Sequence, residues 1–173
     1  MVELRADAQR NLERVLDAAA EVFAEEGPEA SVDEIARRAG VGHGTVFRRF
    51  PTKDDLVYAV VERHVAQMRA LAEEALGSTE PGEAFFAYVR SVAGLAMTTP
   101  GLHKCIAHCG GKPGAAELEE LSCKVVARAQ DAGAVRRDVK PADVQVLVRS
   151  ALMSAPAGEW PRYLDVVLDG LRA

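Results

Sequence analysis

Aromatic residues and cysteines are scarce in this chain, and long apolar runs are missing. Aromatic side chains make up 5% of 173 residues, and runs of alternating β-branched residues do not occur, which argues against a β-sheet protein. No apolar run approaches the roughly 18 residues that a membrane span needs. The first residues, MVELRADAQRN, lack the apolar core of a signal peptide. Three cysteines, an odd number, favour a reducing compartment over a disulfide framework, so we expect a cytoplasmic protein.

Motifs for catalysis and nucleotide binding are also missing. The sequence shows no Ser/His/Asp set, no paired carboxylates and no GKS or GKT loop. Its closely spaced glycines at 40, 42 and 44 follow a helical segment rather than a strand, and Val46 departs from the dinucleotide-binding pattern. We therefore expect neither an enzyme nor a bound cofactor.

Apolar residues recur at helical spacing, for example at Leu12, Val15 and Ala19. The eight prolines fall between such segments or in a first helical turn, where proline is tolerated. The spacing predicts an all-α fold of about nine helices, near residues 8–26, 32–39, 43–50, 53–76, 82–99, 101–109, 115–132, 142–155 and 161–172.

Basic residues cluster in one segment of an otherwise acidic chain. The net charge is −5 at pH 7, yet the stretch from Arg37 to Lys53 holds five basic residues and no acidic one. Residues 1–36 carry ten acidic residues against three arginines. Such an island is the electrostatic footprint of a DNA-binding segment, although helical proteins also carry basic islands by chance.

The stretch GVGHGTVFRRF, residues 40–50, joins two short helical segments. The first segment begins with SVDE, a predicted capping box of Ser31 and Glu34, and TKDD at residues 52–55 predicts a weaker one. Gly27 and Gly40 stand where helices end in a left-handed residue. Two short helices joined by a glycine-containing turn form a helix-turn-helix, whose second helix enters the DNA major groove. The residues expected to pack inward on Val22 and Phe23 are Ile35, Ala36, Ala39, Val41, Val46 and Phe50.

The segment ERVLDAAAEVFAEEGPEASVDEIARRAGVGHGTVFRRFPTKDDLVYAVVERH resembles the N-terminal domain of the TetR family of bacterial transcriptional regulators. The order, spacing and type of its motifs agree over about residues 8–64, and beyond these only the helical organisation matches. The resemblance implies a helix-turn-helix DNA-binding domain at residues 1–52 and an effector-binding and dimerisation domain at residues 53–173.

The family pattern also implies roles for single residues. Arg48 and Arg49 match positions that face the groove, and Lys53 matches a lysine that binds phosphate. Phe47 stands where Tyr is usual, so the hydroxyl that would bind phosphate is missing, and His43 is not the usual residue at its position. The candidate DNA contacts are Ser31, His43, Gly44, Thr45, Phe47, Arg48, Arg49 and Lys53.

By the same resemblance, the larger domain holds an effector pocket and a dimer interface. Two apolar stripes near the C-terminus suit a four-helix interface between subunits, although internal packing also explains them. The candidate interface residues are Val144, Leu147, Val148, Ala151, Leu164, Val167, Leu168 and Leu171. The candidate pocket residues, for which plain core packing is the alternative, are His64, Met68, Phe86, Val89, Met97, Leu102, Cys105 and Ile106.

The stretch HKCIAHC, residues 103–109, carries soft ligands on one helical face. Cys105, His108 and Cys109 stand at i, i+3 and i+4, a spacing that could hold zinc or copper or sense oxidation. A structural zinc site needs four ligands, and this spacing is no established motif. We therefore predict no metal site here, and keep metal or redox sensing as the alternative.

The sequence as a whole predicts a one-component regulator that binds palindromic operator DNA as a homodimer. A small-molecule effector of unknown identity would release it from DNA, which is the repressor behaviour most common in the family. The alternative is a helical small-molecule carrier or enzyme that keeps a vestigial DNA-binding domain.

Overall fold

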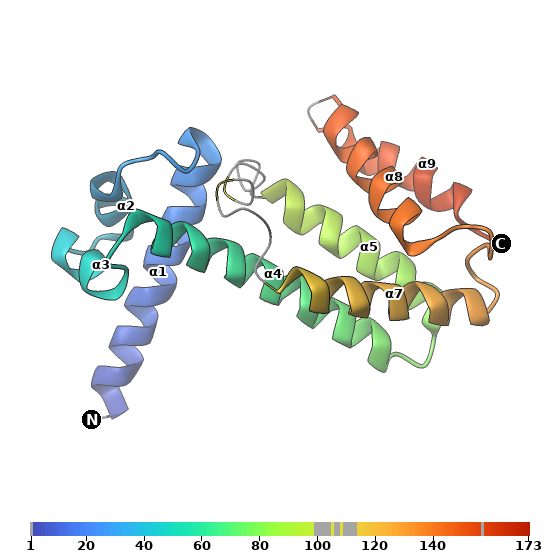
Figure 1. Cartoon of the computed structure of the whole chain (residues 1–173), viewed down its shortest axis with the longest axis horizontal. Helices are drawn as coiled ribbons and strands as arrows, with labels where there is room; N and C mark the ends of the chain where they lie inside the picture. Colours follow the sequence, from blue (N-terminus) through green and yellow to red (C-terminus); the bar gives the residue numbers. More distant parts are fainter. Residues whose placement is uncertain (1, 99–104, 106–107, 109–113, 157) are drawn as a thin grey trace. The chain divides into compact units, whose positions relative to one another are not determined.

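The protein is described by a computed structural model that covers residues 2–98, 105, 108, 114–156 and 158–173. These residues form eight α-helices and no strand, which confirms the predicted all-α class (Figure 1). Most of the predicted helix at residues 101–109 lies outside the described residues. In the described part of the chain, no helix is long and apolar enough to cross a membrane.

The chain divides into two compact units. The first contains Met1–Val65 and the described residues of 99–114. Its helices are α1 (Val2–Glu26), α2 (Val32–Ala39), α3 (His43–Arg49) and the first half of α4 (Lys53–Gly77).

The core of the first unit is the predicted one. Val22, Phe23 and Ile35 are each at most 1% exposed, and Val46 brings α3 onto this core with 1% exposure. Ala36, Ala39 and Phe50 are also buried, whereas Val41 is only half-buried. Since α2 and α3 bury one face each, the short helices are fixed by packing rather than by their own length.

The turns of this unit form largely as predicted. Gly27 and Gly40 adopt positive φ angles of 85° and 63° at helix ends. Thr52 and Asp55 form a complete reciprocal cap, in which each backbone N–H donates to the other's side chain. The predicted box at Ser31 is only half correct. Ser31 Oγ accepts from the Asp33 N–H, but the Glu34 carboxylate accepts from Arg37 and Arg38 instead.

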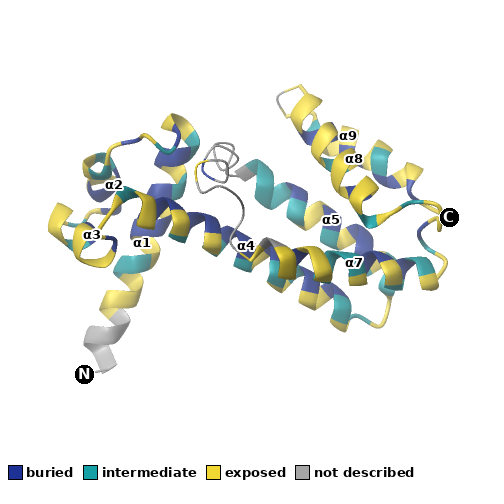
Figure 2. Cartoon of the chain, in the orientation of Figure 1, coloured by how far each residue is buried: buried dark blue, intermediate teal, exposed yellow. Residues whose placement is uncertain are grey.

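The second unit contains Ala66–Thr98 and Ala115–Ala173. It holds the rest of α4 with α5 (Pro81–Thr98), α7 (Ala115–Asp131), α8 (Pro141–Ser154) and α9 (Trp160–Gly170). Buried positions lie on one side of α5 and α9 and exposed positions on the other (Figure 2). Two of these helices begin at their proline, one residue earlier than predicted, because proline is well suited to a first helical turn.

Aromatic side chains organise the core of the second unit. Phe85 and Phe86 pack edge to face with ring centroids 5.1 Å apart. The Arg172 guanidinium lies 4.1 Å from the Phe86 ring centroid, which ties the C-terminus to α5. Trp160 packs against the same core, and its ring tip lies 4.0 Å from the point that a Cβ on Gly94 would occupy.

Candidate nucleic-acid interface

A three-residue turn, residues 40–42, connects α2 to α3. Gly40 adopts the left-handed conformation, with φ 63° and ψ 37°, and its N–H bonds to the carbonyls at the end of α2. The Val41 N–H donates to the Ala36 carbonyl at 3.0 Å, which completes the helix end. The turn therefore satisfies the last carbonyls of α2 and lets α3 begin at once, which is the arrangement of a helix-turn-helix.

Helix α3 presents the predicted polar face to solvent. His43, Gly44, Phe47, Arg48 and Arg49 are exposed. Thr45 is half-buried, and Val46 supplies the buried face. The exposed set matches the candidate DNA contacts that the sequence suggested on this helix, while contact with DNA itself stays a prediction.

Most of the basic island is neutralised inside the first unit. Arg38 bonds to Glu25 at 2.6 Å and to Glu34 at 2.9 Å, and Arg37 bonds to Glu34 at 2.7 Å. Hydrogen bonds from Arg37 and then Arg38 lower the pKa of Glu34 from its usual 4.5 to about 2. Arg38 thus joins α2 to α1, Arg37 is paired within α2, and both arginines have a carboxylate partner in the free chain.

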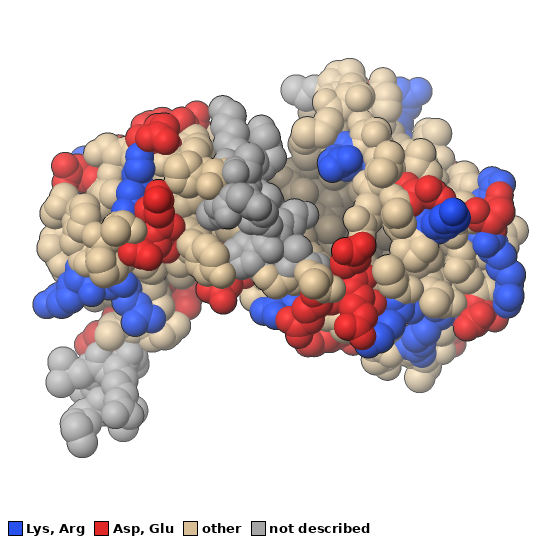
Figure 3. Space-filling model, in the orientation of Figure 1, with Lys and Arg blue, Asp and Glu red and all other residues tan. Residues whose placement is uncertain are grey.

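Arg48 and Arg49 differ from Arg37 and Arg38 in their ion pairing. Among the described residues neither forms an ion pair, and both come from the exposed face of α3. Lys and Arg side chains gather over α3 on the visible face of the molecule (Figure 3). These two guanidinium groups are therefore available to an anionic partner without the loss of an internal ion pair.

Lys53, the candidate phosphate contact, has a carboxylate partner in the free chain. Its Nζ lies 2.8 Å from Glu29 Oε2, and the hydrogen bond from Lys53 lowers the pKa of Glu29. The next residue, Asp54, is bonded to His108 with 2.8 Å between Oδ1 and Nε2. A phosphate that binds Lys53 therefore meets an ammonium group that already has a carboxylate partner.

His43 and Ser31 each have a protein partner from α2. His43 Nδ1 is hydrogen-bonded to Asp33 Oδ1, and its ring stacks on Phe47. The Ser31 hydroxyl accepts from the Asp33 N–H at 3.2 Å, so it serves as a cap while its own proton can still be donated. Asp33 thus connects two candidate contacts, a role that the sequence alone did not suggest because Asp33 and His43 are ten residues apart.

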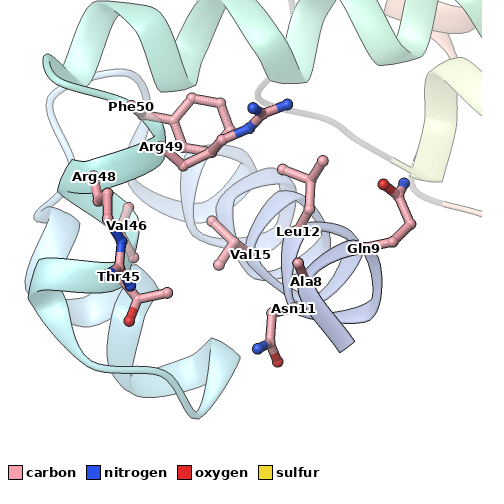
Figure 4. A pocket seen from close by; sticks show the side chains of 10 residues that line it. All are labelled: Ala8, Gln9, Asn11, Leu12, Val15, Thr45, Val46, Arg48, Arg49 and Phe50. Carbon is pink, nitrogen blue, oxygen red and sulfur yellow. The ribbon is translucent and has the colours of Figure 1, made fainter. Parts of the chain in front are cut away.

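A groove of about 510 Å³ runs between α1 and α3 (Figure 4). Leu12 and Val15 from α1 lie opposite Val46 and Phe50, and the polar rim includes Arg48. The full lining is Ala8, Gln9, Asn11, Leu12, Val15, Thr45, Val46, Arg48, Arg49 and Phe50. The α1 residues of this groove were absent from the sequence-based candidates, because nothing in the sequence placed the start of α1 beside α3.

The candidate effector residues are mostly buried. Met68, Phe86 and Val89 lie in the interior of the second unit, Met97 is half-buried there, and His64 and Cys105 are buried in the first unit. Leu102 and Ile106 lie outside the described residues. An open groove of about 600 Å³ between α4 and α5 is lined by Gln67, Ala70, Leu71, Glu74, Ser91, Gly94 and Leu95. None of the described candidates lines that groove, so their contact with an effector stays a prediction.

The candidate interface residues separate into two groups. Val144, Ala151, Leu164, Leu168 and Leu171 are buried in the single chain, so they offer little surface to a partner. Val148 and Val167 are half-buried, and Leu147 is exposed. The helical periodicity identified the stripe that faces the chain's own core, and the exposed large apolar side chains of α8 and α9 are Val146, Leu147, Met153, Tyr163 and Val166.

The stretch HKCIAHC is only partly described. Cys105 is buried and His108 is exposed with Asp54 as its partner, while Cys109 lies outside the described residues. Among the residues that the structure does describe, no group of three metal-binding side chains comes together. A metal or redox role for the full stretch stays a hypothesis.

The fold and the exposed basic face of α3 define the class of this protein as a helix-turn-helix DNA-binding protein. The family model for bacterial regulatory proteins of the tetR family matches residues 15–60. A second model, the transcriptional regulator SbtR-like C-terminal domain, matches residues 80–173. The chain therefore belongs to the TetR family of bacterial transcriptional regulators, as its N-terminal motifs predicted.

Individual relatives agree with this family. A TetR transcription regulatory protein from Mycobacterium vanbaalenii is 41% identical, covers 98% of this chain and 99% of its own, and superposes with a TM-score of 0.76. A TetR regulator from Streptomyces coelicolor is 31% identical over 92% of this chain and 97% of its own, with a TM-score of 0.74. An HTH-type transcriptional regulator from Staphylococcus aureus is 43% identical over 61 residues, so the match spans only 33% of that relative's length.

Proposed function

We propose that the chain is a ligand-responsive repressor that binds palindromic operator DNA as a homodimer. The observation that carries this proposal is the pair of guanidinium groups, Arg48 and Arg49, on the exposed face of α3, neither of which forms an ion pair with any residue that the structure describes. Arginine on a recognition helix pairs with the O6 and N7 acceptors of guanine in the major groove. The N-terminal residues of the same helix, His43 to Thr45, would then contact base edges.

The proposed dimer uses the outer faces of α8 and α9. Val146 and Met153 are 51% and 65% exposed on α8, and Tyr163 and Val166 are 39% and 69% exposed on α9. The two members of each pair share one face of their helix, because they are spaced by seven and three positions, and that face is exposed while the other holds the buried residues. Burial of these four side chains against a second copy would remove apolar surface from water and pair two recognition helices, as a palindromic site requires.

The effector response is proposed from family membership. An unidentified small molecule that binds the second unit would change the spacing of the two recognition helices and so release the operator. The interior of this unit contains Met68, Phe86 and Val89 as buried side chains, which are of the adaptable and apolar kinds that small-molecule sites use.

The test of this function is selection of bound DNA from a random pool with the full chain. We expect a consensus with two-fold symmetry, because two copies of α3 would read equal half-sites. Selection by an Arg48→Ala, Arg49→Ala double variant should give no consensus. A non-palindromic consensus would contradict the dimer, and no enrichment at all would contradict the regulator.

A further inference from the structure

The imidazole of His43 is held on two sides at the first position of α3. Its Nδ1 is hydrogen-bonded to the Asp33 carboxylate of α2, and its ring stacks on Phe47 with centroids 4.4 Å apart and planes inclined by 29°. The His43 side chain is still 54% exposed. The ring is therefore oriented by the protein but remains accessible to a partner in solution.

The partner of Nδ1 determines which ring nitrogen carries the proton. An ionised carboxylate only accepts hydrogen bonds, so Nδ1 has to be the donor. A neutral imidazole has one N–H, and Nε2 is then left with a bare lone pair. The two nitrogens diverge from the ring, so Nε2 points away from Asp33, and among the described residues it has no hydrogen-bond partner.

We propose that Asp33 is a positioning residue that orients His43 to contact a DNA base. The Nε2 atom of His43 would then accept a hydrogen bond from the base when the ring is neutral and donate one when the ring is protonated. With a neutral ring, Nε2 accepts a hydrogen bond from the amino group of adenine or cytosine in the major groove. With a protonated ring, the same nitrogen donates to O6 or N7 of guanine. Protonation of the ring would therefore change the base preferred at this position. This inference rests on the proposed DNA-binding function and adds to it the base that His43 prefers in each protonation state.

The charged groups around the ring support this assignment. Asp33 is the carboxylate that faces the ring from α2, and Arg37, one turn further along α2, is engaged by Glu34. From α1, the Arg14 guanidinium lies beside Gly40 at the turn. A protonated His43 is therefore paired with Asp33 on one side and can still direct its Nε2–H to an acceptor.

The first experiment is DNA selection at about pH 8 and about pH 6 with the full chain and three variants. For the wild type we expect adenine or cytosine at one symmetric pair of positions at the higher pH and guanine at the lower pH, each preferred roughly threefold to tenfold per half-site. His43→Ala should lose both the preference and its pH dependence. Asp33→Ala should weaken the preference at the higher pH, because the free ring then samples both tautomers.

The matched control is Glu26→Ala, which also removes one carboxylate from the first unit but lies at the exposed end of α1. It should leave the base preference unchanged at both pH values. A preference in the wild type that does not change with pH overturns the proposal. A gain in affinity for all sequences alike at low pH also overturns it, since that result assigns Nε2 to phosphate.

The second experiment needs no DNA. Nitrogen-15 NMR of the histidine rings distinguishes the tautomers, and His43→Ala identifies the signal among the four histidines of the chain. We expect the Nδ1–H form for His43 at about pH 8, whereas free histidine prefers Nε2–H, and Asp33→Ala should restore that ordinary form. An Nε2–H wild type overturns the inference even if the protein selects palindromic DNA. An Nδ1–H ring in a chain that selects no DNA confirms the tautomer and refutes the DNA-reading function.

Discussion

Lys53 and Glu29 illustrate how a single contact in the free chain bears on DNA binding. The ammonium group of Lys53 is 2.8 Å from the Glu29 carboxylate, so a phosphate competes with an existing partner. The free energy of one phosphate contact is therefore the difference between two ion pairs. Because phosphate is the same in every sequence, this exchange affects affinity without affecting base preference.

Lys53→Ala should weaken binding to every DNA sequence alike. We expect the slope of log affinity against log salt to become shallower by about 0.9 per lost contact, or about 1.8 for a dimer. Glu29→Gln should have the opposite effect on affinity and strengthen binding to operator and random DNA together. The measurement is a salt titration of both DNAs for each variant. If Lys53→Ala alters sequence preference while Arg48→Ala and Arg49→Ala do not, the proposed orientation of α3 is wrong.

Gly44 offers a second test at the scale of one residue. A Cβ at this helical position would meet no atom within 4 Å, so Gly44→Ala should raise the free energy of unfolding by up to about 1 kcal/mol. We expect the same change to weaken DNA binding, because the added methyl group keeps the backbone away from the DNA. Urea unfolding and DNA titration measure the two effects. Improved binding together with improved stability would show that close approach is not the reason for this glycine.

Gly40→Ala is the contrasting variant. Its φ of 63° is unfavourable for alanine by about 1–2 kcal/mol, and the new Cβ would lie 2.5 Å from Arg14 Nη2. The Arg14 side chain can move aside, but the backbone conformation cannot change without loss of the turn. Gly40→Ala should therefore lower the free energy of unfolding, whereas Gly44→Ala should raise it, although alanine replaces glycine in both variants.

At the scale of elements, α1 and α2 are joined by a charged network as well as by a core. Glu34 accepts hydrogen bonds from Arg37 and Arg38, and Arg38 also binds Glu25 of α1. Because the pKa of Glu34 in the folded chain is about 2 instead of 4.5, the folded state holds its proton less tightly than the unfolded state. The resulting stabilisation is present above about pH 4.5 and is lost as pH falls towards 2.

Glu34→Gln should make stability less dependent on pH in this acidic range. Glutamine cannot ionise, so the part of the pH dependence that Glu34 contributes should disappear between about pH 4.5 and 2. The measurement is the free energy of unfolding by urea at several pH values. Glu26→Gln is the control, since Glu26 is an exposed acidic residue of the same unit and its substitution should preserve the wild-type slope. Identical slopes for the wild type and Glu34→Gln would contradict the shifted pKa.

At the scale of the whole molecule, the proposed homodimer depends on side chains that the single chain leaves exposed. Val146→Glu or Val166→Glu should give a monomer with its helical content retained, because each places a charge on the proposed interface. Gln145→Glu adds the same charge on α8 outside the apolar face and should leave the dimer intact. Sedimentation and circular dichroism measure the two properties. A dimer that survives both interface substitutions would refute this face.

Leu168→Glu should behave differently from these variants. Leu168 is fully buried and belongs to the same core as Leu164 and Phe85, so a carboxylate there has no partner and no water. We expect loss of helical content in the second unit rather than a folded monomer. The comparison separates residues that build the subunit from residues that join two subunits.

The sequence alone was enough to predict most of the helices, several of their ends and the family, although α1 begins at Val2 rather than at the predicted residue 8. Helical periodicity, glycine at residues 27 and 40, and the Thr52–Asp55 cap are local signals, because each acts between residues a few positions apart. The exposed face of α3 could also be predicted from the helical period, because the burial of Val46 determines which side chains of this short helix point outward. Family membership followed from the order of these same local motifs.

The partner of each charged side chain became clear only from the packing of distant segments against one another. The contacts of Lys53 with Glu29 and of His43 with Asp33 join residues far apart in sequence, and no local pattern predicts them. The apolar stripes of α8 and α9 were visible in the sequence, but periodicity cannot say whether a stripe faces the chain's own core or a second subunit. Burial answers that question for Leu164 and Leu168, because it depends on how distant helices pack together.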